Sequence, residues 1–170
     1  MTHRKLESVA RMAGRTTYKD FREGFAARSL MGDSDADIKG AIGIAQRRVG
    51  ALAIQVLETR YASTLAHERA LRRAWERVVR GDGCNAGARA PHASAVRRMG
   101  AALAIRKYAG ARMIHHEIAD YAWLVCSRRE ALEDAMRACG AWLDGLCGEA
   151  ERAFLEALDV IKPRRSGKAA

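Results

Sequence analysis

The chain has 170 residues, of which 49% are hydrophobic, so it can bury a core and wholesale disorder is excluded. It carries 30 basic and 20 acidic residues, giving a formal net charge of +10. Such an excess of base points to a polyanionic partner, most often nucleic acid. Charges or glycines interrupt the longest apolar stretches, so we expect no membrane span. No apolar segment follows the first basic residues, so we also expect a cytoplasmic location.

Nearly the whole chain is expected to be helical, because prolines and β-branched residues are few and no stretch alternates as a strand does. The predicted fold is therefore all-α, a compact bundle of about seven to eight helices in a single domain over residues 1–161. The predicted helices cover about 3–13, 18–30, 36–61, 64–80, 91–108, 112–123, 127–146 and 149–161. Pro163 is expected to end the last helix, leaving residues 162–170 as a basic tail.

The longest predicted helix, about 36–61, is expected to lie at the centre of the core, because its apolar residues recur at steps of three and four. Gly40, Gly43 and Gly50 fall within it. Each glycine costs a helix roughly 1 kcal/mol relative to alanine, which indicates close approach by a neighbouring helix. The clearest loop is predicted at 81–90, where glycines, Asp82 and Asn85 supply turn chemistry.

Charge is distributed unevenly along the chain. Residues 61–112 contain eleven bases and three acids, whereas residues 113–161 contain four bases and ten acids. The predicted helix at 64–80 places arginines on one face, where they are suited to follow a phosphate backbone. An alternative is a solvated face that Glu68 and Glu76 partly neutralise. The DNA contacts predicted in this region are Arg69, Arg72, Arg73, Arg77, Arg80, Arg97 and Arg98.

A candidate helix-turn-helix lies at 112–146. A helix containing Glu117-Ile118-Ala119 runs into a short turn, and Ser127 is predicted to cap the next helix and to form a capping box with Glu130. In such a motif the early side chains of the second helix reach base edges. The DNA contacts predicted here are Ser127, Arg128, Arg129 and Arg137. The alternative is a helical hairpin whose apolar residues simply pack, and the net acidity of the segment favours that alternative.

This stretch resembles the DNA-binding end of bacterial sigma factors and, more closely, the same element in phage antitermination proteins of the Q type. The resembling residues are Cys126-Ser127, the run 137–146 and, nearer the amino terminus, Asp35-Ala36-Asp37-Ile38 and Leu57…Tyr61. They cover about half of the chain in two blocks, separated by an arginine-rich insert at about 62–110. The turn is about two residues longer than in sigma factors, and Trp123 stands where a small residue is usual. The resemblance implies a transcription regulator that acts with DNA and RNA polymerase.

Catalytic and cofactor motifs are missing from the sequence, so we predict a protein that is not an enzyme and needs no cofactor. Cys84, His92, His115 and His116 match no standard zinc-finger spacing, and no metal site is predicted. The alternative function is that of a small helical interaction or assembly protein whose basic face docks an acidic partner. Its oligomeric state is left open.

Overall fold

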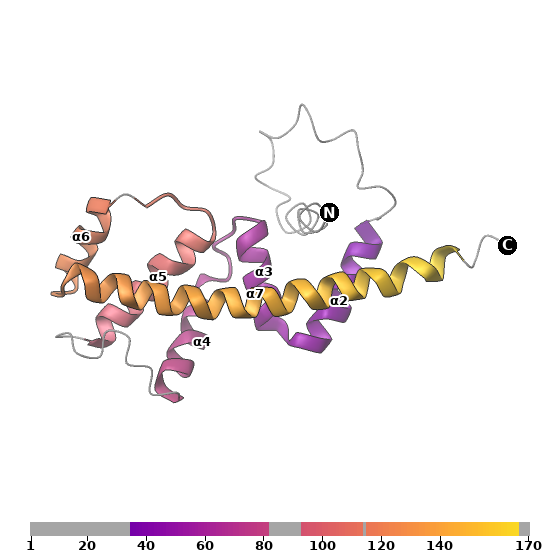
Figure 1. Cartoon of the computed structure of the whole chain (residues 1–170), viewed down its shortest axis with the longest axis horizontal. Coiled ribbons are helices and arrows are strands. Elements are labelled where there is room, and N and C mark those ends of the chain that lie inside the picture. The colour runs from indigo at the N-terminus through magenta and orange to yellow at the C-terminus, as the bar shows by residue number, and fades with distance from the viewer. Residues whose placement is uncertain (1–34, 82–92, 114, 167–170) are drawn as a thin grey trace, which may run out of the picture. The chain divides into compact units, whose positions relative to one another are not determined.

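The computed structural model describes residues 35–81, 93–113 and 115–166 (Figure 1). All regular structure in these residues is helical, which confirms the predicted all-α class. The helices are α2 (Asp35–Val49), α3 (Ala51–Tyr61), α4 (Glu68–Gly81), α5 (Ala93–Tyr108), α6 (His115–Leu124) and α7 (Arg129–Ser166). The helices predicted at 3–13 and 18–30, and nearly all of the loop predicted at 81–90, lie outside the described residues.

The chain divides into two compact units. One unit combines residues 1–64 with residues 146–170, and its described helices are α2, α3 and the later part of α7. The other unit is residues 65–145, with α4, α5, α6 and the earlier part of α7. That the chain folds as one domain stays a prediction.

The prediction of one long helix at about 36–61 is wrong in one respect, because the structure has two helices there, α2 and α3, with a break at Gly50. Gly50 has φ +86° and ψ 162°, a backbone conformation that essentially only glycine adopts. Its N–H still donates to the Gln46 carbonyl at 2.9 Å, which closes α2. Close approach explains a different glycine, since a Cβ on Gly40 would lie 3.3 Å from Ile161 Cδ1.

At the carboxyl-terminal side the prediction is wrong in the opposite way, because two helices were predicted where the structure has one. The helices predicted at 127–146 and 149–161 form the single helix α7, which also continues through Pro163 to Ser166. Buried side chains recur at steps of three and four across the predicted gap, at Cys139, Leu143, Cys147 and Ala150. Burial of such a stripe outweighs the roughly 1 kcal/mol that each interior glycine costs. None of the described helices, this one included, is both long and apolar enough to cross a membrane.

The unit built on α2 and α3 has a core of aliphatic side chains around Phe154, which is fully buried. A polar cluster lies beside it. The Tyr61 hydroxyl donates to Glu151 Oε1 at 2.8 Å, and Cys147 Sγ donates to the same oxygen at 3.2 Å. Burial, and then the hydrogen bond to Glu151, raise the pKa of the Tyr61 phenol. This phenol therefore stays protonated and serves as a donor that ties the end of α3 to α7.

The unit built on α4 and α5 is packed around two tryptophans and a glycine contact. The rings of Trp75 and Trp142 lie 5.5 Å apart at an angle of 46°, within the range of favourable aromatic pairs. Gly100 lies against α7, where a Cβ on it would come within 2.6 Å of the Ala135 Cβ. The backbone of α5 therefore approaches α7 closely at this point. This packing fixes α5 beside α4 and so positions the arginines described below.

The cysteines offer a direct test of these cores. Burial raises the pKa of the Cys139 thiol to about 12, and its side chain is fully buried, whereas Cys126 is exposed. Because the thiolate is the nucleophile, we expect iodoacetamide at pH 8 to label Cys126 at least about a hundredfold faster than Cys139. Peptide mass spectrometry of timed samples measures both rates, with guanidinium-unfolded protein as the control. Equal labelling rates in the native protein would contradict this core.

Candidate nucleic-acid interface

The arginines of α4 lie on the side of the helix opposite its buried residues. Leu71, Trp75 and Val79 recur at steps of four and face the core. Arg69, Arg73 and Arg77 also recur at steps of four, and all three are exposed. We call these three residues the α4 arginine stripe. They form no ion pair with any residue of the described part of the chain, and their charges therefore remain available to a polyanion.

The neighbouring predicted contacts are less available. Arg72 Nη1 lies 3.6 Å from Glu68 Oε1, and Arg80 Nη2 lies 3.9 Å from Glu76 Oε2. Glu68 is also 4.0 Å from Arg106 Nε. The Arg80–Glu76 pair is largely exposed, and such pairs contribute only about 0–1 kcal/mol. Glu68 is only 19% exposed and lies near both Arg72 and Arg106, so Arg72 is the less available of the two predicted contacts. The prediction that Glu68 and Glu76 neutralise part of the face is thus consistent with this geometry, but neither carboxylate pairs with the α4 arginine stripe.

A pocket of about 280 Å³ lies where the second half of α4 meets the first half of α5. It brings together three predicted contacts from two helices, Arg80, Arg97 and Arg98. The rest of its lining was not predicted and consists of Trp75, Glu76, Val79 and Ser94. The sequence signals for Trp75 and Val79 are those of core residues. Only the packing of α4 on α5 shows that they also line a pocket.

The turn between α6 and α7 is well defined and differs from the predicted one. The N–H groups of Cys126 and Ser127 donate to the carbonyls of Trp123 and Ala122, both at 2.9 Å. With Cys126 at φ +50°, these bonds form a Schellman motif that closes α6. The carbonyl of Arg128, rather than that of Ser127, accepts the first bond of α7, from Leu132 N–H.

The predicted capping box is therefore wrong. Ser127 belongs to the end of α6, so its hydroxyl does not cap α7. The Ser127 Oγ is buried and has no hydrogen-bond partner among the described residues. A buried hydroxyl does not extend to a base edge in this conformation. Ser127 is thus a residue of the turn in this structure, and the prediction that it contacts DNA gains no support here.

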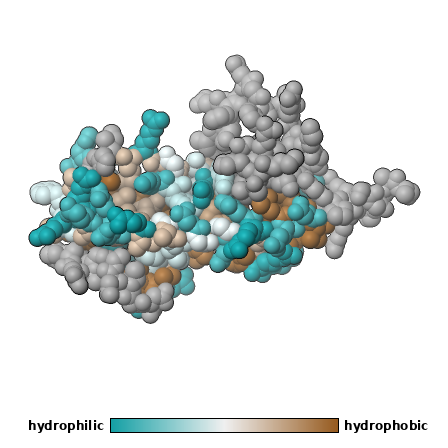
Figure 2. All heavy atoms as spheres, viewed as in Figure 1, coloured by the Kyte–Doolittle hydropathy of each residue, from teal (hydrophilic) through white to brown (hydrophobic). Residues whose placement is uncertain are grey.

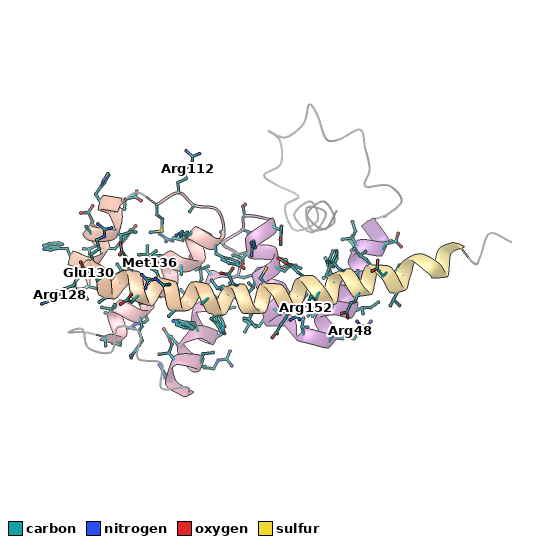
Figure 3. The ribbon with its side chains drawn as sticks, viewed as in Figure 1. Arg48, Arg112, Arg128, Glu130, Met136 and Arg152 are labelled. Carbon is teal, nitrogen blue, oxygen red and sulfur yellow. The ribbon has the colours of Figure 1, made fainter. Side chains whose placement is uncertain are left out.

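The basic residues of the predicted recognition helix are mostly engaged within the helix. Arg129 Nε donates to Glu133 Oε1 at 2.7 Å, and Arg137 Nη1 donates to Asp134 Oδ1 at 3.0 Å. Arg128 is exposed and lies at the start of α7 near Glu130 (Figure 3). Acidic side chains thus pair with Arg129 and Arg137, whereas Arg128 has no ion pair among the described residues. The helix-turn-helix stays a prediction. Residues 128–137 contain three bases and three acids, whereas residues 68–80 contain five bases and two acids.

Hydrophilic residues on the molecular surface are grouped. On the face shown in Figure 2, hydrophilic side chains lie in separate groups with paler and hydrophobic residues between them. Arg112, which precedes α6, points away from the ribbon (Figure 3).

The described residues contain no group of three or more side chains able to hold a metal ion. Of the four residues considered as zinc ligands, Cys84 and His92 lie outside the described residues.

The α4 arginine stripe and the pocket thus make α4 and α5 the candidate basic surface of the described part of the chain. A comparison with known protein families, with curated proteins and with solved structures finds no match to this chain. The likeness to antitermination proteins consequently depends on the short motifs quoted above and on nothing broader.

Proposed function

We propose that this protein binds the phosphate backbone of nucleic acid, and that the α4 arginine stripe makes the principal contacts. The observation that carries the proposal is the set of three exposed guanidinium groups on one helical face, unpaired within the described residues. From Arg69 to Arg77 the helix axis rises about 12 Å. Duplex DNA presents about seven phosphate charges over that length. The spacing therefore suits several simultaneous contacts.

The sharper version of the proposal is a transcription regulator that acts as a phage-type antiterminator on DNA and RNA polymerase. It is supported by the Cys126-Ser127 turn, by the run at 137–146 and by the two short motifs in α2 and α3. In this version the α4 arginine stripe supplies phosphate contacts that are independent of sequence, and Arg128 supplies a contact at the start of α7. Backbone contacts position a protein on DNA, whereas base contacts give specificity.

A second function, a helical protein that docks a protein partner, is favoured by a different observation. Trp123 and Leu124 at the end of α6 are 79% and 61% exposed. Exposed tryptophan is enriched at protein interfaces because one side chain buries a large apolar area. Under this alternative the basic surface of α4 and α5 would meet an acidic protein.

The salt dependence of binding tests the proposal against its alternative. We expect fluorescence anisotropy on pooled duplex DNA to show log affinity falling with log salt at a slope of about −2.7 or steeper, because each phosphate contact contributes about −0.9. Poly-glutamate as a competitor controls for attraction to any polyanion. If poly-glutamate displaces the protein as well as unlabelled duplex does at equal charge, the basic surface is a protein-docking face and the proposal is wrong.

A further inference from the structure

The pocket between α4 and α5 combines features that surface arginines alone do not have. It is concave, its volume is about 280 Å³, and its lining includes the side chains of Trp75 and Val79 together with three arginines. Trp75 and Val79 are 4% and 9% exposed, so they form a fixed wall. Small-ligand sites are typically concave, apolar and equipped with a few convergent polar groups. At about 280 Å³ this pocket lies just below the usual range of about 300–1,000 Å³, which suits a small ligand.

The polar groups of the pocket are suited to an anion with two charges. Arg80, Arg97 and Arg98 supply three positive charges and Glu76 supplies one negative charge. The local balance matches a phosphate monoester, which carries about −1.5 to −2 at pH 7, better than a backbone diester with a single charge. A terminal phosphate also enters a pocket more readily than a phosphate flanked by two sugars.

Donors in the pocket are partly positioned in advance. Arg98 Nε donates to the Ser94 carbonyl at 3.3 Å, which holds the guanidinium on the pocket side of α5 and uses one of its five N–H donors. The Ser94 hydroxyl is a further lining group. The indole N–H of Trp75 is buried without an acceptor among the described residues, an arrangement that costs stability unless it is relieved. The donors in this lining outnumber its acceptors, because Glu76 supplies its one acidic group.

We propose that this pocket binds one phosphate monoester dianion, supplied either by a free mononucleotide or by the phosphorylated end of a nucleic acid. The guanidinium groups of Arg97 and Arg98 would bind its oxygens, the Ser94 hydroxyl would donate a further hydrogen bond, and Trp75 and Val79 would contact the apolar part of the adjoining sugar or base. This site shares no residue with the α4 arginine stripe. Phosphate binding in the pocket and DNA binding by the stripe can therefore be tested separately, and either proposal can be wrong without the other.

Equilibrium dialysis with radiolabelled adenosine 5′-monophosphate, at fixed ionic strength, tests the proposal. We expect one nucleotide bound per chain and labelled adenosine bound at least about tenfold more weakly, because it lacks the charged acceptor. Arg97→Gln with Arg98→Gln should weaken nucleotide binding about a hundredfold, and Ser94→Ala by a few-fold. The matched control, Arg73→Gln with Arg77→Gln, removes the same charge from α4 outside the pocket and should change affinity less than about threefold.

Circular dichroism confirms that each variant keeps its helices before its affinity is compared. The proposal is overturned if adenosine binds as well as its monophosphate, or if the control pair weakens binding as much as the pocket pair. Competition with an oligonucleotide that carries a 5′-phosphate identifies the source of the phosphate. Stronger displacement by this oligonucleotide than by the mononucleotide supports a nucleic-acid end, and the reverse supports a free nucleotide. Equal displacement by the same oligonucleotide with a 5′-hydroxyl contradicts the site.

Discussion

Replacing Arg69, Arg73 and Arg77 together by glutamine is expected to weaken duplex DNA binding about a hundredfold at 0.15 M salt. Each lost phosphate contact removes about 0.9 from the slope of log affinity against log salt, so the slope should become shallower by about 2.7. The three residues are exposed and make no ion pair within the described part of the chain, so the folded structure loses little. Anisotropy titrations over a salt series measure both the affinity and the slope.

The matched control removes three arginines from the candidate recognition helix, with Arg128, Arg129 and Arg137 changed to glutamine. The change in net charge is the same. Residues 128–137 contain three acidic side chains beside these three arginines, so this segment has no net charge and we expect a loss of less than about tenfold. If the control variant loses more affinity than the first, DNA binds at the start of α7 and not along α4. If both lose equally, only net charge matters and no defined interface exists.

Gly100→Ala is expected to destabilise the protein by about 1–3 kcal/mol, although alanine is the better helix former. The new Cβ would lie 2.6 Å from the Ala135 Cβ and 3.1 Å from two backbone atoms, the Ala135 carbonyl carbon and the Met136 nitrogen. Helix backbone does not yield as a flexible side chain does, so α5 and α7 would have to separate. That cost exceeds the roughly 1 kcal/mol gained in helix propensity.

Gly140→Ala on α7 is the natural comparison, because its Cβ would meet nothing within 4 Å. Here only the helix propensity changes, and we expect a gain of about 0.8–1 kcal/mol. Urea unfolding followed by circular dichroism gives both free energies of unfolding. The same substitution should therefore act with opposite sign at the two positions. A stabilising effect of Gly100→Ala would mean that α5 does not pack against α7 as described.

The sequence pattern was sufficient for the helical class and for the α4 arginine stripe, because both depend on spacing along one helix. It was insufficient at helix ends. Gly50 and the glycines at 145 and 148 look alike in sequence, yet one breaks a helix and the others do not. The difference lies in the backbone, since Gly50 has φ +86° whereas Gly145 and Gly148 continue α7, and the sequence does not show which conformation a glycine adopts. The capping box predicted from Ser127 and Glu130 is wrong for a related reason. Ser127 N–H takes part in the Schellman motif that ends α6, so Ser127 does not cap α7.

The pocket lay beyond sequence reasoning for a different reason. Arg80 and Arg97 are separated by seventeen positions, and only the packing of α5 on α4 brings them together. Arg97 and Arg98 were predicted as DNA contacts on charge alone. Their partnership with Trp75 and Ser94 depends on which face of α5 turns toward α4.

The division of the chain into units sets an order for its synthesis. Residues 65–145 form a continuous unit, whereas the other unit needs residues on both sides of that stretch. During translation the continuous unit can complete its contacts as soon as residue 145 has left the ribosome. α2 and α3 emerge first, but they must wait for the chain beyond residue 146 before Phe154 can fill their core. Until then the core side chains of α2 and α3 lack Phe154 as a packing partner, so this unit is completed last although its first helices are made early.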